Sequence, residues 1–223
     1  MAILLKPLLG DLSGVVGNAV IQKYRNQYVV KTRQVPWDTQ QTTKRKQKQH
    51  INLAVMSSFL AEFRDVIDCG YQKNYRNLPA RAQAMKYNLE CALLDGVDGP
   101  VPDYPEIKFS RGCREPAWSA SMVRGGEPNE VVVKWEIPQT VKLKEVRNDK
   151  AYLIFWNPEK NKEFEYTDIE RAALGIILPV FLAVQAVPGA VIHGWIFFVS
   201  PDGKEVSDTD YLGSLVFGEP GTE

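Results

Sequence analysis

The second half of the chain alternates apolar and polar residues in several short runs, and this pattern limits the fold more than any other feature. Val131, Val133 and Trp135 are separated by single residues, so a strand would place them on one face. The runs "KAYLIFWN" and "KEFEYT" flank the turn "PEKN", and "VIHGWIFFVS" and "KEVSDTDYLGSLVF" flank "PDG". Roughly five to seven strands of this kind predict an immunoglobulin-like or fibronectin-like β-sandwich, with Trp135, Phe155 and Phe198 in its core.

A basic segment marked by glycines lies near the start, "LSGVVGNAVIQKYRNQYVVKTRQVP", residues 12 to 36. Two β-prone runs flank Arg25 and Asn26, which suit a tight turn. We therefore predict a β-ribbon of two strands, whose polar face carries Lys23, Arg25, Lys31 and Arg33. Since a two-stranded ribbon is marginal in water, it must lean on the rest of the protein or on another molecule.

The glycines of "SGVVGN" also invite comparison with phosphate-binding loops. The segment lacks the Lys-Ser/Thr of a P-loop and the third glycine of the dinucleotide fingerprint, and a strand follows it. Strand geometry, with bends at Gly14 and Gly17, is therefore the prediction here.

Helical periodicity replaces the alternation after Thr43. Apolar residues recur at steps of three and four: Leu53, Met56, Leu60, Phe63 and Ile67. This spacing predicts one long amphipathic helix, capped at Thr42 or Thr43 and ending at Gly70. Pro79 suits the first turn of a second, shorter helix that packs back on the first.

The segment "DGVDGPVPDYP", residues 95 to 105, is too rich in glycine and proline to continue a helix. It predicts a linker with a domain boundary near residue 100. The expected fold is thus α+β, with a β-ribbon and a two-helix hairpin in residues 1–99 and the β-sandwich in residues 100–223.

Basic and aromatic residues gather early in a chain whose formal net charge is zero. The candidate partner-binding residues are Lys23, Tyr24, Arg25, Tyr28, Lys31, Arg33, Trp37, Lys44, Arg45, Lys46 and Lys48. Three interpretations remain open: a solvated surface guarded by lysine, a docking surface for an acidic protein, and a contact with nucleic acid through phosphates and stacked bases.

No set of residues has the spacing of an active site or a metal site. Cys69, Cys91 and Cys113 include no CxxC pair and are expected to be buried thiols, while His50 and His193 have no obvious co-ligands. No strained nucleophile motif is present. We therefore expect a protein that is not an enzyme and that needs no cofactor or metal. A carbohydrate-binding sandwich is a further alternative, using Trp118, Trp156 or Trp195.

Two apolar stretches bear on targeting. In "MAILLKPLLGDLSG", Lys6 and Pro7 interrupt a short apolar run, which is unlike a secretory signal. We therefore expect the chain to be made in the cytoplasm without a signal peptide. Residues 172–199 are strongly apolar, but proline and glycine divide them into pieces too short for one membrane-spanning helix, so buried strands and no membrane contact are expected.

Five motifs occur in this order along the chain: "GDLSGVVGNAVIQKYRNQYVVKTR", "FLAEFRDVIDCGY", "IKFSRG", "DKAYLIFWNPEKNKEFEY" and "FFVSPDGKEVSDTDYLG". In these the chain resembles an uncharacterised family of Bacteroidetes and associated phage-like elements. The resemblance implies a non-enzymatic protein with an N-terminal ribbon and helices and a C-terminal sandwich, of a kind compatible with virion parts.

The expected function is that of a structural or interaction protein. The marginal ribbon, the local basic cluster and the missing active site favour a subunit of a multi-subunit assembly, most plausibly phage-like, that docks through its N-terminal ribbon. Its partners would be other protein subunits, in a homo-oligomer or a hetero-complex. The alternative is a nucleic-acid-binding module that uses the basic segment 23–48.

Overall fold

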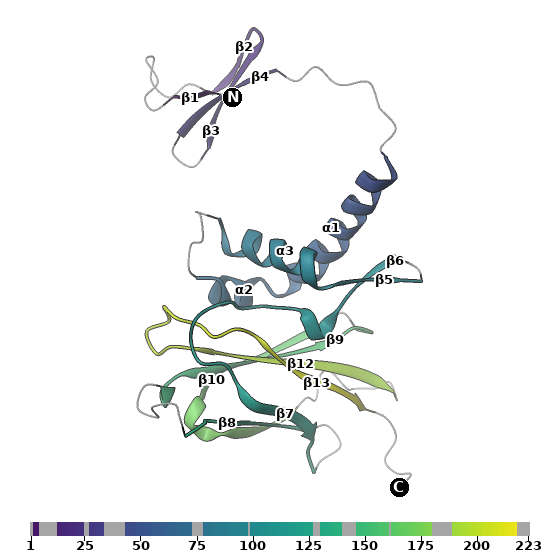
Figure 1. Cartoon of the computed structure of the whole chain (residues 1–223), viewed down its shortest axis with the longest axis vertical. Coiled ribbons are helices and arrows are strands. Elements are labelled where there is room, and N and C mark those ends of the chain that lie inside the picture. Colours follow the sequence, from purple (N-terminus) through teal and green to yellow (C-terminus); the bar gives the residue numbers. More distant parts are fainter. Residues whose placement is uncertain are drawn as a thin grey trace. The chain divides into compact units, whose positions relative to one another are not determined.

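The computed structural model describes residues 2–4, 13–24, 27–33, 43–72, 78–97, 99–126, 130–139, 146–160, 162–179 and 189–217. Within these residues the fold is α+β, and every sheet is antiparallel. The chain forms two compact units, Met1–Gln47 and Lys48–Glu223 (Figure 1). Each unit has its own sheets.

The N-terminal unit contains a four-stranded sheet in the order β1-β4-β3-β2. Its strands are β1 (Ala2–Leu4), β2 (Gly14–Val16), β3 (Ala19–Tyr24) and β4 (Gln27–Thr32). The two-stranded ribbon expected from the sequence is thus the centre of a larger sheet, because β1 pairs along β4 and β2 pairs along β3. Tyr24 pairs with Gln27, which leaves two residues for the predicted turn; Arg25 and Asn26 themselves lie outside the described residues.

Seven strands of the C-terminal unit form two packed sheets. One sheet has the order β10-β9-β12-β13 and the other β11-β8-β7. The strands are β7 (Trp118–Arg124), β8 (Glu130–Glu136), β9 (Lys150–Asn157), β10 (Lys162–Glu170), β11 (Gly175–Pro179), β12 (Ala190–Val199) and β13 (Asp210–Phe217). The chain crosses between the sheets after β8, β10 and β11, so the predicted β-sandwich is confirmed.

Apolar side chains from both sheets fill the interior of the sandwich. Val131, Val133 and Trp135 point inward from β8, as their alternation predicts, and meet Phe155 and Phe198 from the opposite sheet. All five are at most 1% exposed. The three predicted core aromatics are therefore confirmed.

Three helices precede the sandwich: α1 (Lys44–Glu62), α2 (Arg64–Gly70) and α3 (Ala80–Cys91). The start and the end of the predicted long helix are confirmed. The Gln47 N–H donates a hydrogen bond to the Thr43 carbonyl at the start, and α2 ends at Gly70. The helix is not continuous, however, because Phe63 leaves helical geometry with ψ of 36°. The predicted second helix also begins directly after Pro79.

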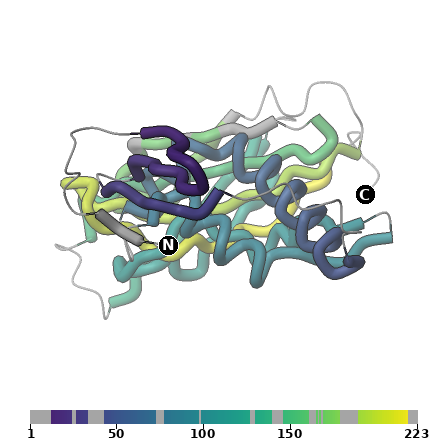
Figure 2. The backbone as a smooth tube through the Cα atoms, turned by 90° about the horizontal axis from the view of Figure 1, so that it is seen from above, coloured from purple at the N-terminus to yellow at the C-terminus, as the bar shows by residue number. Residues whose placement is uncertain are grey.

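The helices cover the outer face of the four-stranded sheet, so the C-terminal unit has three layers: helices, four strands and three strands (Figure 1). Seen from above in Figure 2, the helices lie in front of the strands. A second core joins the two layers, with Met56, Leu60 and Phe63 from the helices against Trp156 and Trp195 from β9 and β12. Because of this shared core, the compact units separate after Gln47 and not at the expected boundary near residue 100.

The expected linker is folded. Strands β5 (Leu93–Gly96) and β6 (Gly99–Pro102) form a hairpin, and a short 3-10 helix, η2 (Tyr104–Glu106), follows it. The ring of Tyr104 packs against the helix–sheet core. Glycine and proline therefore mark a hairpin here, because β5 pairs with β6 and the Asp103 N–H donates back to the Ala92 carbonyl.

The apolar stretch 172–199 supplies β11 and β12. Strand β12 is buried along most of its length, as expected, whereas Ile177 of β11 is 61% exposed. Residues 180–188 lie outside the described residues. Among the described helices, none has the length and apolar character needed to cross a membrane.

Candidate interaction surface

The register of the N-terminal sheet decides where its basic residues point. Lys23 lies opposite Tyr28, whereas Lys31 lies opposite Val20. Directly opposite residues share a face and neighbouring residues alternate, so Lys23 and Lys31 lie on opposite faces of the sheet. The prediction of a single basic face on the ribbon is therefore wrong, because the strand register directs the side chains of Lys23 and Lys31 to opposite sides of the sheet.

The two tyrosines of this sheet differ in exposure. Tyr24 is 62% exposed at the end of β3, whereas Tyr28 is 6% exposed and lies under the Lys23 ammonium, 5.7 Å from its ring centroid. Tyr28 is thus buried within its own sheet and offers little surface for the partner contact that we expect of it. Lys31 donates to the side chain of Gln22 over 2.9 Å. These local contacts hold the basic side chains along their own sheet.

The outer strand β2 presents two valines to solvent. Val15 is 57% exposed and Val16 is 68% exposed; as neighbours on one strand they face opposite sides of the sheet. Gly14, with φ of 141°, and Gly17, with φ of 57°, flank them, which confirms strand geometry for "SGVVGN". An apolar edge strand with no charged residue of its own is a ready template for pairing with another strand.

Basic side chains also surround the start of α1. Lys44, Arg45 and Lys46 are exposed, and the first turn contains no acidic residue. Lys48 is exposed as well but forms an ion pair of 2.8 Å with Asp95 of β5. Arg33 is exposed after β4, whereas the candidates Arg25 and Trp37 lie outside the described residues.

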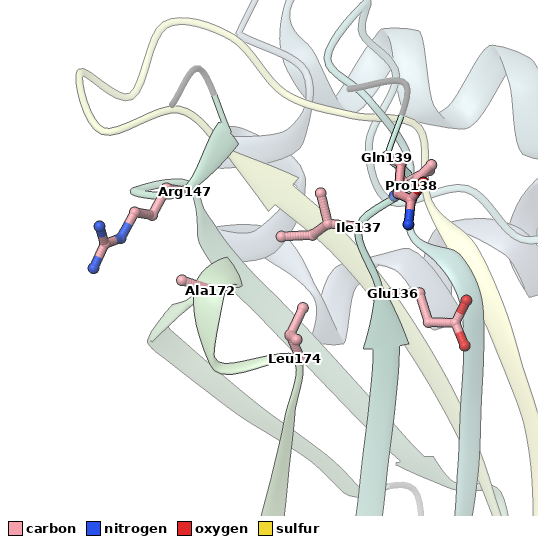
Figure 3. A pocket seen from close by; sticks show the side chains of 7 residues that line it. All are labelled: Glu136, Ile137, Pro138, Gln139, Arg147, Ala172 and Leu174. Carbon is pink, nitrogen blue, oxygen red and sulfur yellow. The ribbon is translucent and has the colours of Figure 1, made fainter. Parts of the chain in front are cut away.

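A broad pocket of about 670 Å³ opens beside the end of β8 (Figure 3). Its apolar centre is formed by Ile137 and Leu174. In Figure 3 the carboxylate of Glu136 and the guanidinium of Arg147 point away from this centre on opposite sides. Catalytic and small-molecule sites need polar groups that converge, so these side chains do not form a reaction centre.

A cluster of Arg114, Asp149 and Arg171 fastens the segment before β7 to the sandwich, with Asp149 and Arg171 fully buried. Arg114 contacts the Asp149 carboxylate at 2.7 Å, and Arg171 lies 3.6 Å from it. Arg171 also donates to the carbonyl oxygens of Glu115 and Pro116 and covers the ring of Phe198 at 4.0 Å. Burial lowers the pKa of Arg171, and the hydrogen bond to Asp149 raises that of Arg114. The cluster is structural, since these groups are engaged with one another.

His193 of β12 is half-buried beside two tyrosines. Its Nδ1 atom lies 2.7 Å from the Tyr211 hydroxyl, and its ring packs on Tyr104 at a centroid distance of 4.1 Å. Burial lowers the pKa of this imidazole to about 4. The folded protein therefore holds His193 in its neutral form at neutral pH.

This shift predicts a loss of stability in mild acid. The unfolded chain, with a histidine pKa of about 6.5, binds the proton more readily than the folded chain, so the stability present above about pH 6.5 is lost as the pH falls toward 4. After solvent screening of the partly exposed ring, we expect this loss to be about 1–2 kcal/mol. Urea denaturation of the wild type and of His193→Gln between pH 7 and 4 measures it; parallel pH curves would contradict the assignment.

Two of the proposed carbohydrate-stacking tryptophans are unavailable. Trp156 is 3% exposed and Trp195 is fully buried, because both belong to the helix–sheet core, and only Trp118 of the three is exposed. The expectation that all three cysteines are buried thiols is wrong. Cys69 is half-buried, and Cys91 and Cys113 are exposed; no disulfide joins them.

Comparisons with solved structures give weak similarities. "Myokine structure" is 12% identical with a TM-score of 0.35, over 49% of this chain and 100% of that one. The FN5 domain of Drosophila Lar is 11% identical with a TM-score of 0.33, over 47% and 96%. A family 76 glycoside hydrolase from a bovine Bacteroides thetaiotaomicron strain is 11% identical with a TM-score of 0.35, over 48% of this chain but only 21% of the hydrolase.

No curated protein matches the chain. A family model does, over residues 11–213, which include most of the N-terminal sheet, all three helices and nearly the whole sandwich. The protein therefore belongs to DUF6266, a family of unknown function.

Proposed function

We propose that the protein is a non-enzymatic subunit of a multi-subunit assembly and that copies associate through the edge strand β2. The observation that carries this proposal is the sparse burial of the N-terminal sheet. Among its described side chains only Tyr28 and Val29 are buried, one on each face, while Val15 and Val16 are exposed. A small sheet gains stability when further strands extend it, and pairing along β2 would cover both valines.

Two further proposals concern the role of the sandwich and the kind of assembly. The seven-stranded sandwich, with sheets of three and four strands, serves as a fibronectin-like spacer. Resemblance of the motifs to a phage-associated family favours a virion-type particle as the assembly.

Light scattering tests the association. We expect the mass of the wild type to exceed that of a monomer and to depend little on salt, because strand pairing and apolar contact carry the interface. Val15→Lys with Val16→Lys is expected to give a monomer, since lysine on an edge strand opposes pairing. Val216→Lys, which changes a valine of β13 that is 50% exposed, is the control and should leave the mass unchanged. A wild-type monomer at every concentration, or loss of association in the control alone, would overturn the proposal.

A nucleic-acid-binding module is the second candidate, favoured by the exposed Lys44, Arg45 and Lys46 at the start of α1. The same light-scattering series with added mixed-sequence DNA or RNA separates the two functions. Binding through these residues would weaken steeply with salt, because each phosphate contact releases counterions. A wild-type monomer that binds nucleic acid in this way would replace the first proposal.

A further inference from the structure

The outer face of the three-stranded sheet carries a row of apolar side chains. In the strand order β11-β8-β7, Ile177 lies directly opposite Val132, and Val132 lies directly opposite Val123. Directly opposite residues share a face, so the three side chains form one row across all three strands. The row points away from the interior of the sandwich, because its neighbours along β8, Val131 and Val133, point inward.

This apolar row is accessible to solvent. Ile177 is 61% exposed, Val123 is 48% exposed, and Val132 is half-buried between them. Helices cover the outer face of the four-stranded sheet, whereas the three-stranded sheet is the layer farthest from them (Figure 1). Single exposed apolar residues are ordinary, but adjoining ones on one face are typical of a contact surface.

Charged side chains flank the apolar row along β8. Glu130 lies two residues before Val132 and Lys134 lies two residues after it, so both share its face. Lys134 is exposed and forms no ion pair with another described residue. The face therefore has a negative charge on one side of the row and a positive charge on the other.

This arrangement of charges is complementary to itself. A second copy can face the sheet through a twofold axis that runs along the apolar row, so that each row residue lies on its own counterpart. The same rotation reverses the strand direction, and Lys134 of each copy then lies against Glu130 of the other. An axis along the strands would instead place like charges together, which opposes packing. The charges thus select one orientation.

We propose that the outer face of the three-stranded sheet is a contact between two copies of this chain. Ile177, Val132 and Val123 form its centre, and two ion pairs between Lys134 and Glu130 flank them. The contact is distinct from pairing along β2 and does not depend on it. An assembly that uses both contacts grows beyond a pair of copies, because each contact joins a different surface.

The size of the face limits the strength of this contact. Three strands of about seven residues cover roughly 14 Å by 23 Å, or about 300 Å² per copy. A stable interface buries about 800 Å² per partner. We therefore expect a dissociation constant on the order of 0.1 mM for this contact by itself.

Sedimentation equilibrium of the variant with both Val15→Lys and Val16→Lys tests the contact without the β2 edge. We expect a monomer at ~5 µM, as in dilute light scattering, and a monomer–dimer equilibrium as the concentration rises to ~1 mM. Adding Ile177→Lys should weaken the dimer at least about tenfold, since two ammonium groups would meet at the axis. Val216→Lys, in the other sheet of the sandwich, is the control and should leave the dimer unchanged.

Three results would overturn the proposal: a monomer at ~1 mM, growth beyond a dimer, or a dimer that Ile177→Lys leaves intact. Failure of the β2 proposal is seen separately. In that case the wild type would associate no more strongly than the variant with Val15→Lys and Val16→Lys.

A charge exchange tests the orientation of the two copies. Lys134→Glu and Glu130→Lys, each made in the same monomeric variant, should weaken the dimer by about fivefold or more, because each places like charges together. An equimolar mixture of the two should recover the dimer, since each lysine then meets a glutamate again. Mixing does not repair structural damage, so recovery would identify the contact. No recovery between two variants that circular dichroism shows to be folded would contradict this orientation.

Discussion

Replacing Asp149 with alanine is expected to lower the free energy of unfolding by about 3–5 kcal/mol. Asp149 is fully buried and is the carboxylate that both Arg114 and Arg171 contact. Its removal leaves the fully buried Arg171 without a counter-charge, and burial of an unpaired charge is among the largest costs in a folded protein. Urea denaturation followed by circular dichroism measures the change.

Two further variants separate charge from shape at this site. Asp149→Asn keeps the volume of the side chain but removes its charge, so it should also be strongly destabilising. Glu159→Ala, in the exposed turn after β9, should change the free energy of unfolding by less than about 0.5 kcal/mol. An Asp149→Asn variant as stable as the wild type would show that ion pairing does not hold the segment before β7.

Replacing Phe63 with alanine is expected to lower the free energy of unfolding by about 3–5 kcal/mol. Phe63 is fully buried, and its ring lies 4.6 Å from that of Phe109 and 5.3 Å from that of Trp156. A cavity at this position loosens the helices from the four-stranded sheet. Because the two layers share this core, helical circular dichroism and tryptophan fluorescence should report one transition, shifted by the same amount.

An exposed position on α1 provides the control. Leu53 is 47% exposed on α1, so Leu53→Ala should change the stability by less than about 0.5 kcal/mol. Two separate transitions in the Phe63→Ala variant, with the tryptophan signal unchanged, would show that the helices fold apart from the sandwich and would argue against the shared core.

The sequence by itself determined the local elements of this protein. Alternation at Val131, Val133 and Trp135 predicted an inward-facing strand. The apolar steps after Thr43 predicted one continuous helix ending at Gly70, and the structure forms it as α1 and α2 with a break at Phe63. These patterns are readable because a strand repeats every two residues and a helix every 3.6, so the side to be buried shows in a short window.

Tertiary structure alone decided which surfaces remained exposed. Strand register placed Lys23 and Lys31 on opposite faces, and packing of the helices on the four-stranded sheet buried Trp156 and Trp195 and drew Tyr104 into the core. Burial of this kind depends on the element that covers a residue, and that element comes from a distant part of the chain. No local pattern of charge or aromaticity therefore identifies the exposed edge strand β2, or the burial of these tryptophans, before the sheets are assembled.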